Sequence, residues 1–167
     1  MSVRAVQADD AHTVLAPDGI TIVPFALPGM AQLSIMEGRI PPRPEPFPIH
    51  YHGAIEQVTY VLAGEITVST WDATHDAAAT FTARPGDAFI TLPLQTLSFA
   101  NYGPDEARVL FVCAPAYPPD DSDTRLAGEH RAPTEADCAW SRERQEIALG
   151  DFAANMTKRI SSGCGGR

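Results

Sequence analysis

Short apolar segments separated by glycine and proline constrain the fold of this chain more than any other feature of its sequence. Eight such segments, rich in Val, Ile, Thr and Phe, recur between about residues 19 and 116, among them "GITIVPFA", "EQVTYVLAG" and "ARVLFVCAP". No helical pattern lies between them, and evenly spaced short strands are typical of an antiparallel sandwich or barrel. The sequence therefore predicts an all-β fold for this part of the chain.

The segments that flank this β region divide the chain further. The sequence predicts, in chain order, an N-terminal arm, the β-barrel, a surface loop, a helical segment and a flexible tail: residues 1–18, 19–118, 119–133, 134–160 and 161–167. The surface loop is polar and rich in proline, without strand periodicity.

The helical segment shows both a start signal and an apolar stripe. Thr134 has the features of an N-cap, with Asp137 three residues on. Further along, Phe152, Met156 and Ile160 follow one another at helical spacing. We expect such a stripe to pack against the barrel or a partner subunit. The alternative is that the helix forms a lid over a ligand site.

Composition and charge narrow the partners of the chain. Its 167 residues suit one domain, and its formal net charge is -9 with no basic cluster. This balance argues against nucleic acid and anionic membranes as partners and favours a small-molecule ligand. The N-terminus lacks an apolar leader, and no apolar run is long enough to span a membrane. The three cysteines have no C-x-x-C spacing and fit no disulfide framework, so we expect a cytoplasmic protein.

Two histidines mark the candidate site. The stretch "FPIHYHGAIEQVTYVLAGEITV" begins at Phe47 and contains His50 and His52, two residues apart. Because alternate residues of a strand point to the same face, this spacing presents both imidazoles on one side of a sheet. Such a pair can begin a metal site or can carry protons. Alternatively, it is a purely structural pair satisfied by internal hydrogen bonds.

Two motifs of the chain resemble those of the cupin family. The first, H-x-H followed by Gly, matches His50, His52 and Gly64 with the adjoining "YVLAGE". The second opens with "PGD", and its matching positions are Pro85, Gly86, Asp87, Pro93, Phe99 and Asn101. The resemblance covers most of residues 48–120. It implies a double-stranded β-helix, that is, a jelly-roll barrel, and a homodimer. Together with the helical segment, the expected fold is this barrel with a C-terminal helical extension.

The resemblance also implies a metal site, from which this chain departs at two positions. Gln57 stands where the first motif has its Glu, and Glu56 lies one residue earlier. A shift of one residue turns a side chain to the opposite face, so Glu56 reaches the site only if the strand begins irregularly. The histidine of the second motif is replaced by Leu97 in one alignment and by Ser98 in another.

These departures leave the cofactor open. His50, His52 and Gln57 are the metal-ligand candidates and could hold one divalent ion, Zn, Fe, Ni or Mn, with low affinity because the set lacks a carboxylate. A metal-free site is the alternative. In either case, the catalytic candidates are His50, His52 and Glu56, and inward Val61, Leu97 and Phe99 would favour an aromatic or polyketide-like ligand over a bare sugar acid.

Three functions follow from these residues. The first is a cupin enzyme of the non-oxidative type, a lyase, isomerase or cyclase, that transforms an organic metabolite by histidine acid–base or weak Lewis-acid chemistry. The second is an iron-dependent dioxygenase, which requires a carboxylate ligand. The third is a ligand-binding cupin without turnover, because function resides in the site and not in the fold.

Overall fold

The structure is a computed structural model that describes residues 12–25, 32–72, 75–128 and 133–163. Eleven strands and one helix form within this part of the chain. In order they are β1 (Val14–Leu15), β2 (Thr21–Pro24), β3 (Ser34–Ile40), β4 (His50–His52), β5 (Glu56–Ala63), β6 (Ile66–Asp72), β7 (His75–Ala83), β8 (Ala88–Thr91), β9 (Thr96–Ala100), β10 (Ala107–Ala114), β11 (Thr124–Leu126) and α1 (Glu135–Gly163). The predicted all-β domain with a C-terminal helix is confirmed.

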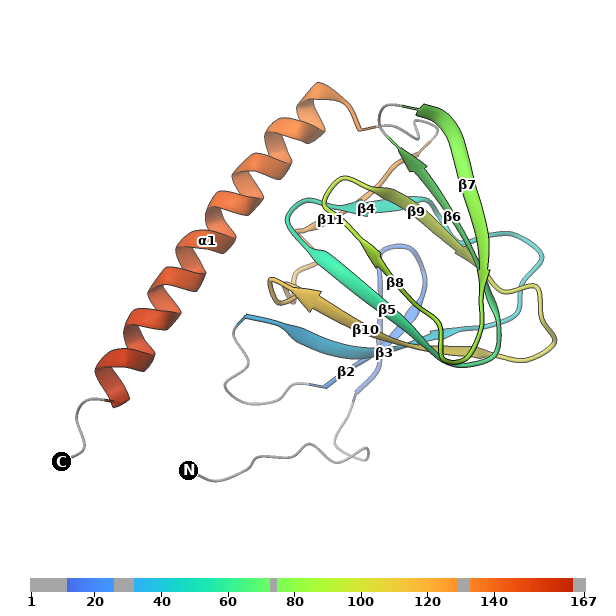
Figure 1. Ribbon diagram of the computed structural model, residues 1–167, viewed down its shortest axis with the longest axis horizontal. Helices are drawn as coiled ribbons and strands as arrows, with labels where there is room; N and C mark the ends of the chain where they lie inside the picture. Colours follow the sequence, from blue (N-terminus) through green and yellow to red (C-terminus); the bar gives the residue numbers. More distant parts are fainter. Residues whose placement is uncertain (1–11, 26–31, 73–74, 129–132, 164–167) are drawn as a thin grey trace.

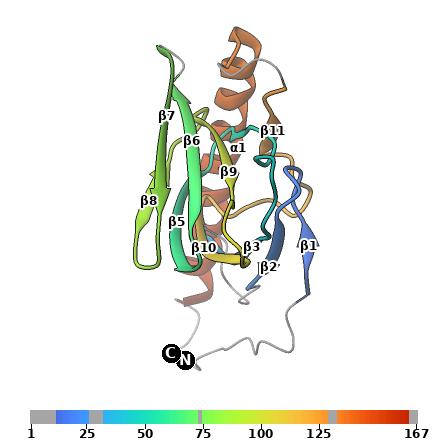
Figure 2. The same cartoon turned by 90° about the vertical axis from the view of Figure 1, so that its right-hand side faces the viewer.

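The strands pair into two antiparallel sheets that face one another. One sheet has the order β1-β2-β3-β10-β5-β8, and the other has the order β11-β4-β9-β6-β7. Figure 1 shows the sandwich that they form, with α1 running beside it. In Figure 2, β1 and β2 lie at one side of the sandwich and β7 and β8 lie at the other. The order in each sheet mixes early and late strands, as expected of a jelly roll.

Alternating burial along β5 shows how the sequence builds this core. Gln57, Thr59 and Val61 are buried, whereas the residues between them are exposed. One face of the strand therefore points into the sandwich, as the two-residue period requires. The largest fully buried side chains of the core share this inward direction and are apolar for the most part: Phe99, Ile20, Ile40, Ile55, Ile66, Leu97, Val61, Val68 and Val109.

Two turns need the glycines that the sequence supplies. Gly64 has φ of 73°, and Gly86 has φ of 97°. Both values lie in the left-handed region that side chains with a Cβ rarely adopt. At Gly64 a Cβ would also lie 2.7 Å from the Cα of Ala107, so this position in the turn between β5 and β6 has no room for a side chain.

Two short strands lie outside the residues predicted for the barrel. The described part of the predicted arm includes β1, which pairs with β2 in register Val14↔Ile22. The predicted surface loop contains β11, which pairs with β4 in register Thr124↔His52. Both segments lack an alternating apolar pattern because each strand is short and covers an edge of its sheet, so sequence periodicity misses them.

The helix α1 begins where the capping signal predicts. The Asp137 amide donates to Thr134 Oγ1 at 3.3 Å, and the Thr134 amide donates to Asp137 Oδ2 at 2.9 Å. These reciprocal bonds satisfy donors that the first turn leaves free. The described helix is too polar and too short in apolar sequence to cross a membrane.

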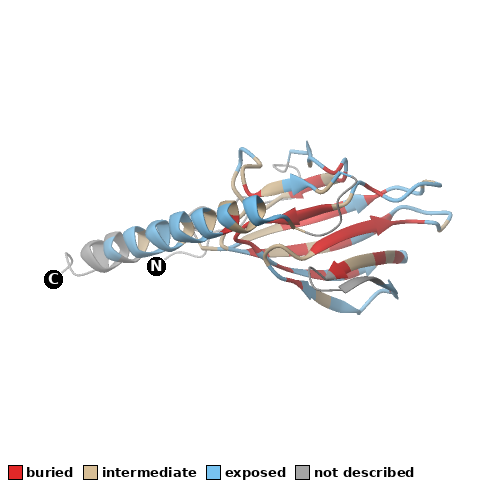
Figure 3. Ribbon diagram, turned by 90° about the horizontal axis from the view of Figure 1, so that it is seen from above, coloured by how far each residue is buried: buried red, intermediate tan, exposed pale blue. Residues whose placement is uncertain are grey.

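Within the described residues, the hydrogen bonds and ring contacts between α1 and the sandwich come from the first turns of the helix. Ser141 Oγ donates to the Gly53 carbonyl at 2.5 Å, and the Trp140 ring lies in edge contact with Tyr51 at 6.1 Å between centroids. Figure 3 shows the helix extending away from the sheets with a largely exposed surface. Phe152 of the predicted stripe is half-exposed, and the side chains of Met156 and Ile160 lie outside the described residues.

Candidate functional site

The two histidines lie side by side on β4, as their spacing predicts. The exposed fraction is 4% for His50 and 5% for His52, and their ring centroids are 5.6 Å apart. β4 is only three residues long and is held between β11 and β9. Its brevity follows from the prolines before it, which cannot donate to a ladder. The strand therefore presents two buried imidazoles to one cavity.

The neighbouring strand β5 brings Gln57 to this cavity and takes Glu56 away from it. Gln57 is buried and lines the cavity, and its amide oxygen accepts a bond from the Cys113 thiol at 3.4 Å. Glu56 is exposed and lies outside the cavity lining. β5 alternates regularly from its first residue, so the irregular start that Glu56 needed is missing. The structure does not bring Glu56 to the histidine pair.

A carboxylate that the sequence analysis did not single out lies next to His50. Asp18 Oδ2 is 3.4 Å from His50 Nδ1, and both side chains are almost completely buried. Asp18 Oδ1 accepts a bond from the Ile20 amide at 3.1 Å, which fixes the carboxyl group. An acceptor beside one ring nitrogen of a histidine favours the tautomer with its proton on that nitrogen. Asp18 therefore favours the proton of His50 on Nδ1, which leaves Nε2 as the unprotonated nitrogen.

A hydroxyl chain orients His52. The Thr124 hydroxyl lies 3.1 Å from His52 Nδ1, and the Tyr117 phenol lies 2.7 Å from the Thr124 hydroxyl. Burial raises the pKa of Tyr117 above its ordinary value, so the phenol stays protonated and can donate to Thr124. If Thr124 in turn donates to Nδ1, the ring proton of His52 resides on Nε2.

The environment keeps His52 uncharged. Burial and the neighbouring His50 lower the pKa of His52 to about 3. Within the described residues, His52 Nε2 is a buried atom without a hydrogen-bond partner. An unpartnered buried polar atom costs free energy, so it marks a place where a ligand atom can bind.

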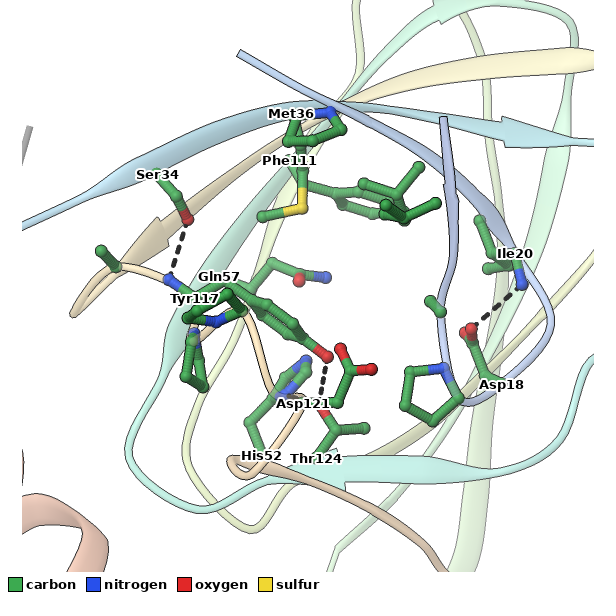
Figure 4. Close-up of a pocket in the computed structure, with 18 of the residues that line it drawn as sticks. Asp18, Ile20, Ser34, Met36, His52, Gln57, Phe111, Tyr117, Asp121 and Thr124 are labelled. Carbon is green, nitrogen blue, oxygen red and sulfur yellow. Dashed lines mark hydrogen bonds between the residues drawn. The ribbon is translucent and has the colours of Figure 1, made fainter. Parts of the chain in front are cut away.

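The cavity that these residues line has a volume of about 690 Å³. Figure 4 shows Asp18, His52, Gln57 and Tyr117 around it. Its wall is mostly apolar and includes Met36, Phe99 and Phe111, together with Ile20 and Ile22 from the edge of the larger sheet. Of the three residues expected to make the interior apolar, Phe99 lines the cavity, whereas Leu97 and Val61 belong to the core behind it.

Three functional candidates come from segments that carry no motif. Asp18 precedes a glycine and is typical of a turn, and Tyr117 and Thr124 lie in the segment that follows β10. Sequence periodicity could not select them, because none belongs to a strand with an alternating pattern. The pairing of β11 with β4 places Thr124 directly opposite His52.

The donor set does not fit a cupin metal site. β9 pairs with β4 in register His50↔Leu97, so a fully buried leucine occupies the position beside the histidines. Ser98 instead donates to the Phe47 carbonyl at 2.6 Å. Within the described part of the chain, no group of three or more His, Cys, Asp or Glu side chains is arranged to hold a metal.

The other histidines lie apart from the pair. His12 is exposed at the rim of the cavity. His75 begins β7, in a stretch whose side chains lie outside the described residues, and His130 also lies outside them.

Comparison with known families identifies the domain. Residues 36–113 match the family model described as "Cupin domain". This part of the chain is a cupin domain. It contains both histidines, Gln57 and the β9 position where the family's last histidine would stand. No curated protein sequence matches the chain significantly.

Solved cupin structures share the fold at low sequence identity. Oxalate decarboxylase from Lactobacillus farciminis, in its formate complex, has a TM-score of 0.58 and 18% identity, with 71% of this chain and 34% of that chain covered. Streptomyces PAC13 with uridine has a TM-score of 0.58 and 14% identity over 82% of this chain and 98% of that chain. Drosophila melanogaster CENP-C bound to CAL1 has a TM-score of 0.54 and 18% identity, with 65% of this chain and 83% of that chain covered.

These neighbours differ in what they do. This chain spans about a third of the oxalate decarboxylase, and PAC13 is described as a nucleoside dehydratase. The CENP-C structure contains a protein partner. At these identities, the likeness establishes the fold alone.

Proposed function

We propose that this cupin domain binds an organic metabolite in the apolar cavity and transforms it by metal-free acid–base chemistry, as a lyase, isomerase or cyclase. The observation that carries the proposal is the arrangement of two buried imidazoles with different environments. His50 is held by a carboxylate, whereas His52 is held by a hydroxyl and has an unpartnered nitrogen. Two titratable groups in contrasting environments are how proteins divide acid and base roles.

The roles follow from the hydrogen bonds. With its Nδ1 directed to Asp18, His50 offers Nε2 as a base that can accept a proton from a carbon or hydroxyl of the ligand. A neutral His52 with its proton on Nε2 donates a hydrogen bond to a carbonyl or hydroxyl oxygen and stabilises the charge that develops there. Asp18 stabilises the imidazolium that His50 becomes. Together these groups support an elimination or an isomerisation.

A panel assay in D₂O tests this function. We would incubate the protein with nucleosides, cyclic ketones, aromatic amines and sugar acids, and follow deuterium uptake and loss of water by mass spectrometry. We expect uptake into at least one compound, and a decrease of about 10²- to 10⁴-fold in the His50→Gln variant. Glu56→Gln is the matched control, because Glu56 lies outside the cavity.

A second candidate, binding without turnover, is favoured by the same unpartnered His52 nitrogen. It replaces the first if a compound binds with an affinity that depends on His52 but returns from D₂O unchanged. The panel assay therefore separates the two functions with one protein preparation.

The dioxygenase alternative receives no support from the donor set. Glu56, the carboxylate that the sequence offered, is exposed, and the position beside His50 is held by Leu97. Asp18 lies beside His50, but among the described residues it forms no group with the two histidines that is arranged to hold a metal. Elemental analysis of the purified protein beside the His50→Ala/His52→Ala double variant tests this point. Near-stoichiometric metal that is lost in the double variant would contradict a metal-free site, and metal absent from both proteins would support it.

A further inference from the structure

The charged groups that line the cavity indicate which chemical class of ligand it binds. Two carboxylates, Asp18 and Asp121, line the cavity, and neither Lys nor Arg is among the described residues that line it. Figure 4 shows Asp121 directed into the cavity on the side of Tyr117, with Asp18 on the other side. The cavity thus has negative groups on two sides and no permanent cation.

Asp121 faces no cation among the described residues. Its carboxylate forms no ion pair with any residue that the structure describes, and its side chain is only partly buried. Burial raises the pKa of the Tyr117 phenol, the Thr124 hydroxyl lowers it, and the nearby carboxylates Asp121 and Asp18 raise it further, as expected of two negative groups that lie around this phenol. Asp18 is balanced at most by His50, so Asp121 leaves the cavity negative.

The histidines cannot offset this charge for an anionic ligand. His52 stays neutral because it is fully buried and lies beside His50. His50 already faces the Asp18 carboxylate. A carboxylate or phosphate in the cavity would therefore lose its hydration, meet two like charges and find no fixed cation, which is strongly unfavourable in an apolar environment.

We propose that the cavity selects a ring-bearing apolar molecule that carries a protonated amine and excludes carboxylates and phosphates. The amine binds between Asp121 and Asp18, and the ring packs against Phe99, Phe111 and the face of Tyr117. The unpartnered His52 nitrogen is the second observation that points to a ligand here, because it offers a hydrogen bond to a polar atom of the same molecule. This inference rests on the proposed binding of a metabolite in the cavity and names its chemical class.

Three indole compounds with one ring system and different head groups test the charge preference. Tryptamine carries an ammonium group, tryptophol a hydroxyl group and indoleacetate a carboxylate. Their affinities for the full chain would be measured by titration calorimetry at about pH 8, where ordinary imidazoles are uncharged and ordinary amines are protonated. We expect tryptamine to bind about tenfold tighter than tryptophol, and indoleacetate at least about a hundredfold weaker than tryptamine.

Variants assign the preference to the cavity. Asn accepts the left-handed backbone of residue 121, where φ is 56°, so Asp121→Asn should keep the fold. We expect this variant to lose most of the advantage of tryptamine over tryptophol. Glu56→Gln removes one negative charge outside the cavity and should leave the advantage unchanged, which controls for the net charge of the chain.

The inference is overturned if indoleacetate binds as tightly as tryptamine, if tryptophol binds tighter than tryptamine, or if tryptamine does not bind at millimolar concentration. Its failure is distinct from failure of the proposed function. If proton transfer depends on His50 but amines are not preferred, the proposed enzyme function stands and the proposed ligand class is wrong. If amines are preferred but no proton transfer occurs, the ligand class stands and the protein binds its ligand without turnover.

Discussion

Asp18 is the residue that most changes the interpretation of the histidine pair. From the sequence, the pair lacked a carboxylate, because the family position holds Gln57 and Glu56 points outward. The fold brings a carboxylate from a different segment to Nδ1 of His50. The site therefore has a carboxylate that orients a base, in place of one that would bind a metal.

Replacing Asp18 should therefore impair proton transfer more than ligand binding. We expect Asp18→Asn to lower the deuterium uptake rate by about 10²-fold or more, because the imidazolium of His50 loses its counter-charge. Ligand affinity should change much less for an uncharged compound such as tryptophol. Pre-steady-state exchange rates and calorimetric affinities, measured on the same variant, check this split. An equal loss in both quantities would assign Asp18 a structural role only.

The neutral state of His52 makes a prediction about pH and stability. The unfolded imidazole has a pKa of about 6.5, whereas burial and His50 lower the folded pKa to about 3. Between these values, the unfolded chain binds a proton that the folded chain does not. The contribution of His52 to stability is therefore complete above the unfolded pKa and falls as the pH drops, by about 1.4 kcal/mol for each pH unit.

Urea unfolding between about pH 5 and pH 7 checks this prediction, because ordinary carboxylates remain mostly ionised there. The His52→Gln variant should lose this part of the pH dependence, while His12→Gln, at an exposed position, should retain it. Nitrogen chemical shifts of the folded protein should also report a neutral His52 across this range. Protonation of His52 near its ordinary pKa would contradict the prediction.

At the scale of elements, the contact between α1 and the turn after β4 links the helix to the site. Gly53 lies under the helix, and a Cβ there would be 2.9 Å from the Trp140 ring and 3.1 Å from Arg144 Cγ. Asp123 accepts bonds from the Ala54 and Ile55 amides, which fixes the same turn from below. The turn that follows both histidines is thus clamped on two sides.

We expect Gly53→Ala to weaken this clamp. The added methyl group pushes Trp140 outward, so the free energy of unfolding should fall by about 1 to 3 kcal/mol. Denaturant unfolding and Trp140 fluorescence measure the effect. Gly150→Ala, where a Cβ meets no atom within 4 Å, is the matched control and should not destabilise the chain. A neutral Gly53→Ala variant would show that the helix does not clamp the turn.

The ion-pair cluster on the outer face of the larger sheet joins β3 to β10. Arg108 contacts Glu37 through two bonds, of 3.0 and 2.7 Å, and Arg39 adds a third at 3.2 Å. The hydrogen bonds from Arg108 lower the pKa of Glu37, so its contribution to stability is present above the ordinary carboxyl pKa and is lost as the pH falls below it. Because the arginines are half-exposed, we expect Glu37→Gln to cost only about 0.5 to 1 kcal/mol in urea unfolding near pH 7, and less in high salt.

At the scale of the whole molecule, the homodimer that the resemblance implies remains a prediction. The outer face of β5 exposes Val58, Tyr60 and Leu62, each about 40% accessible in the single chain. Size-exclusion chromatography with light scattering, at several protein concentrations, checks the prediction directly. A mass of 17.9 kDa at all concentrations would indicate a monomer.

The sequence by itself determined the features that depend on local patterns. The period of two along β5, the glycines of two turns and the capping pair at Thr134 and Asp137 predicted strands, turns and the helix start, because each pattern acts between residues close in the chain. The spacing of His50 and His52 likewise predicted a shared face. The outward direction of Glu56 followed from the same period once β5 proved regular.

Only the tertiary structure decided what surrounds the histidines. Asp18 lies 32 residues before His50 and Thr124 lies 72 residues after His52. Their contacts depend on the pairing of β1 with β2 and of β4 with β11. All four are short strands without a periodic signal of their own. The carboxylates, the unpartnered nitrogen and the cavity therefore arise from non-local pairing, which a single sequence does not reveal because loop closure brings together residues that no local pattern connects.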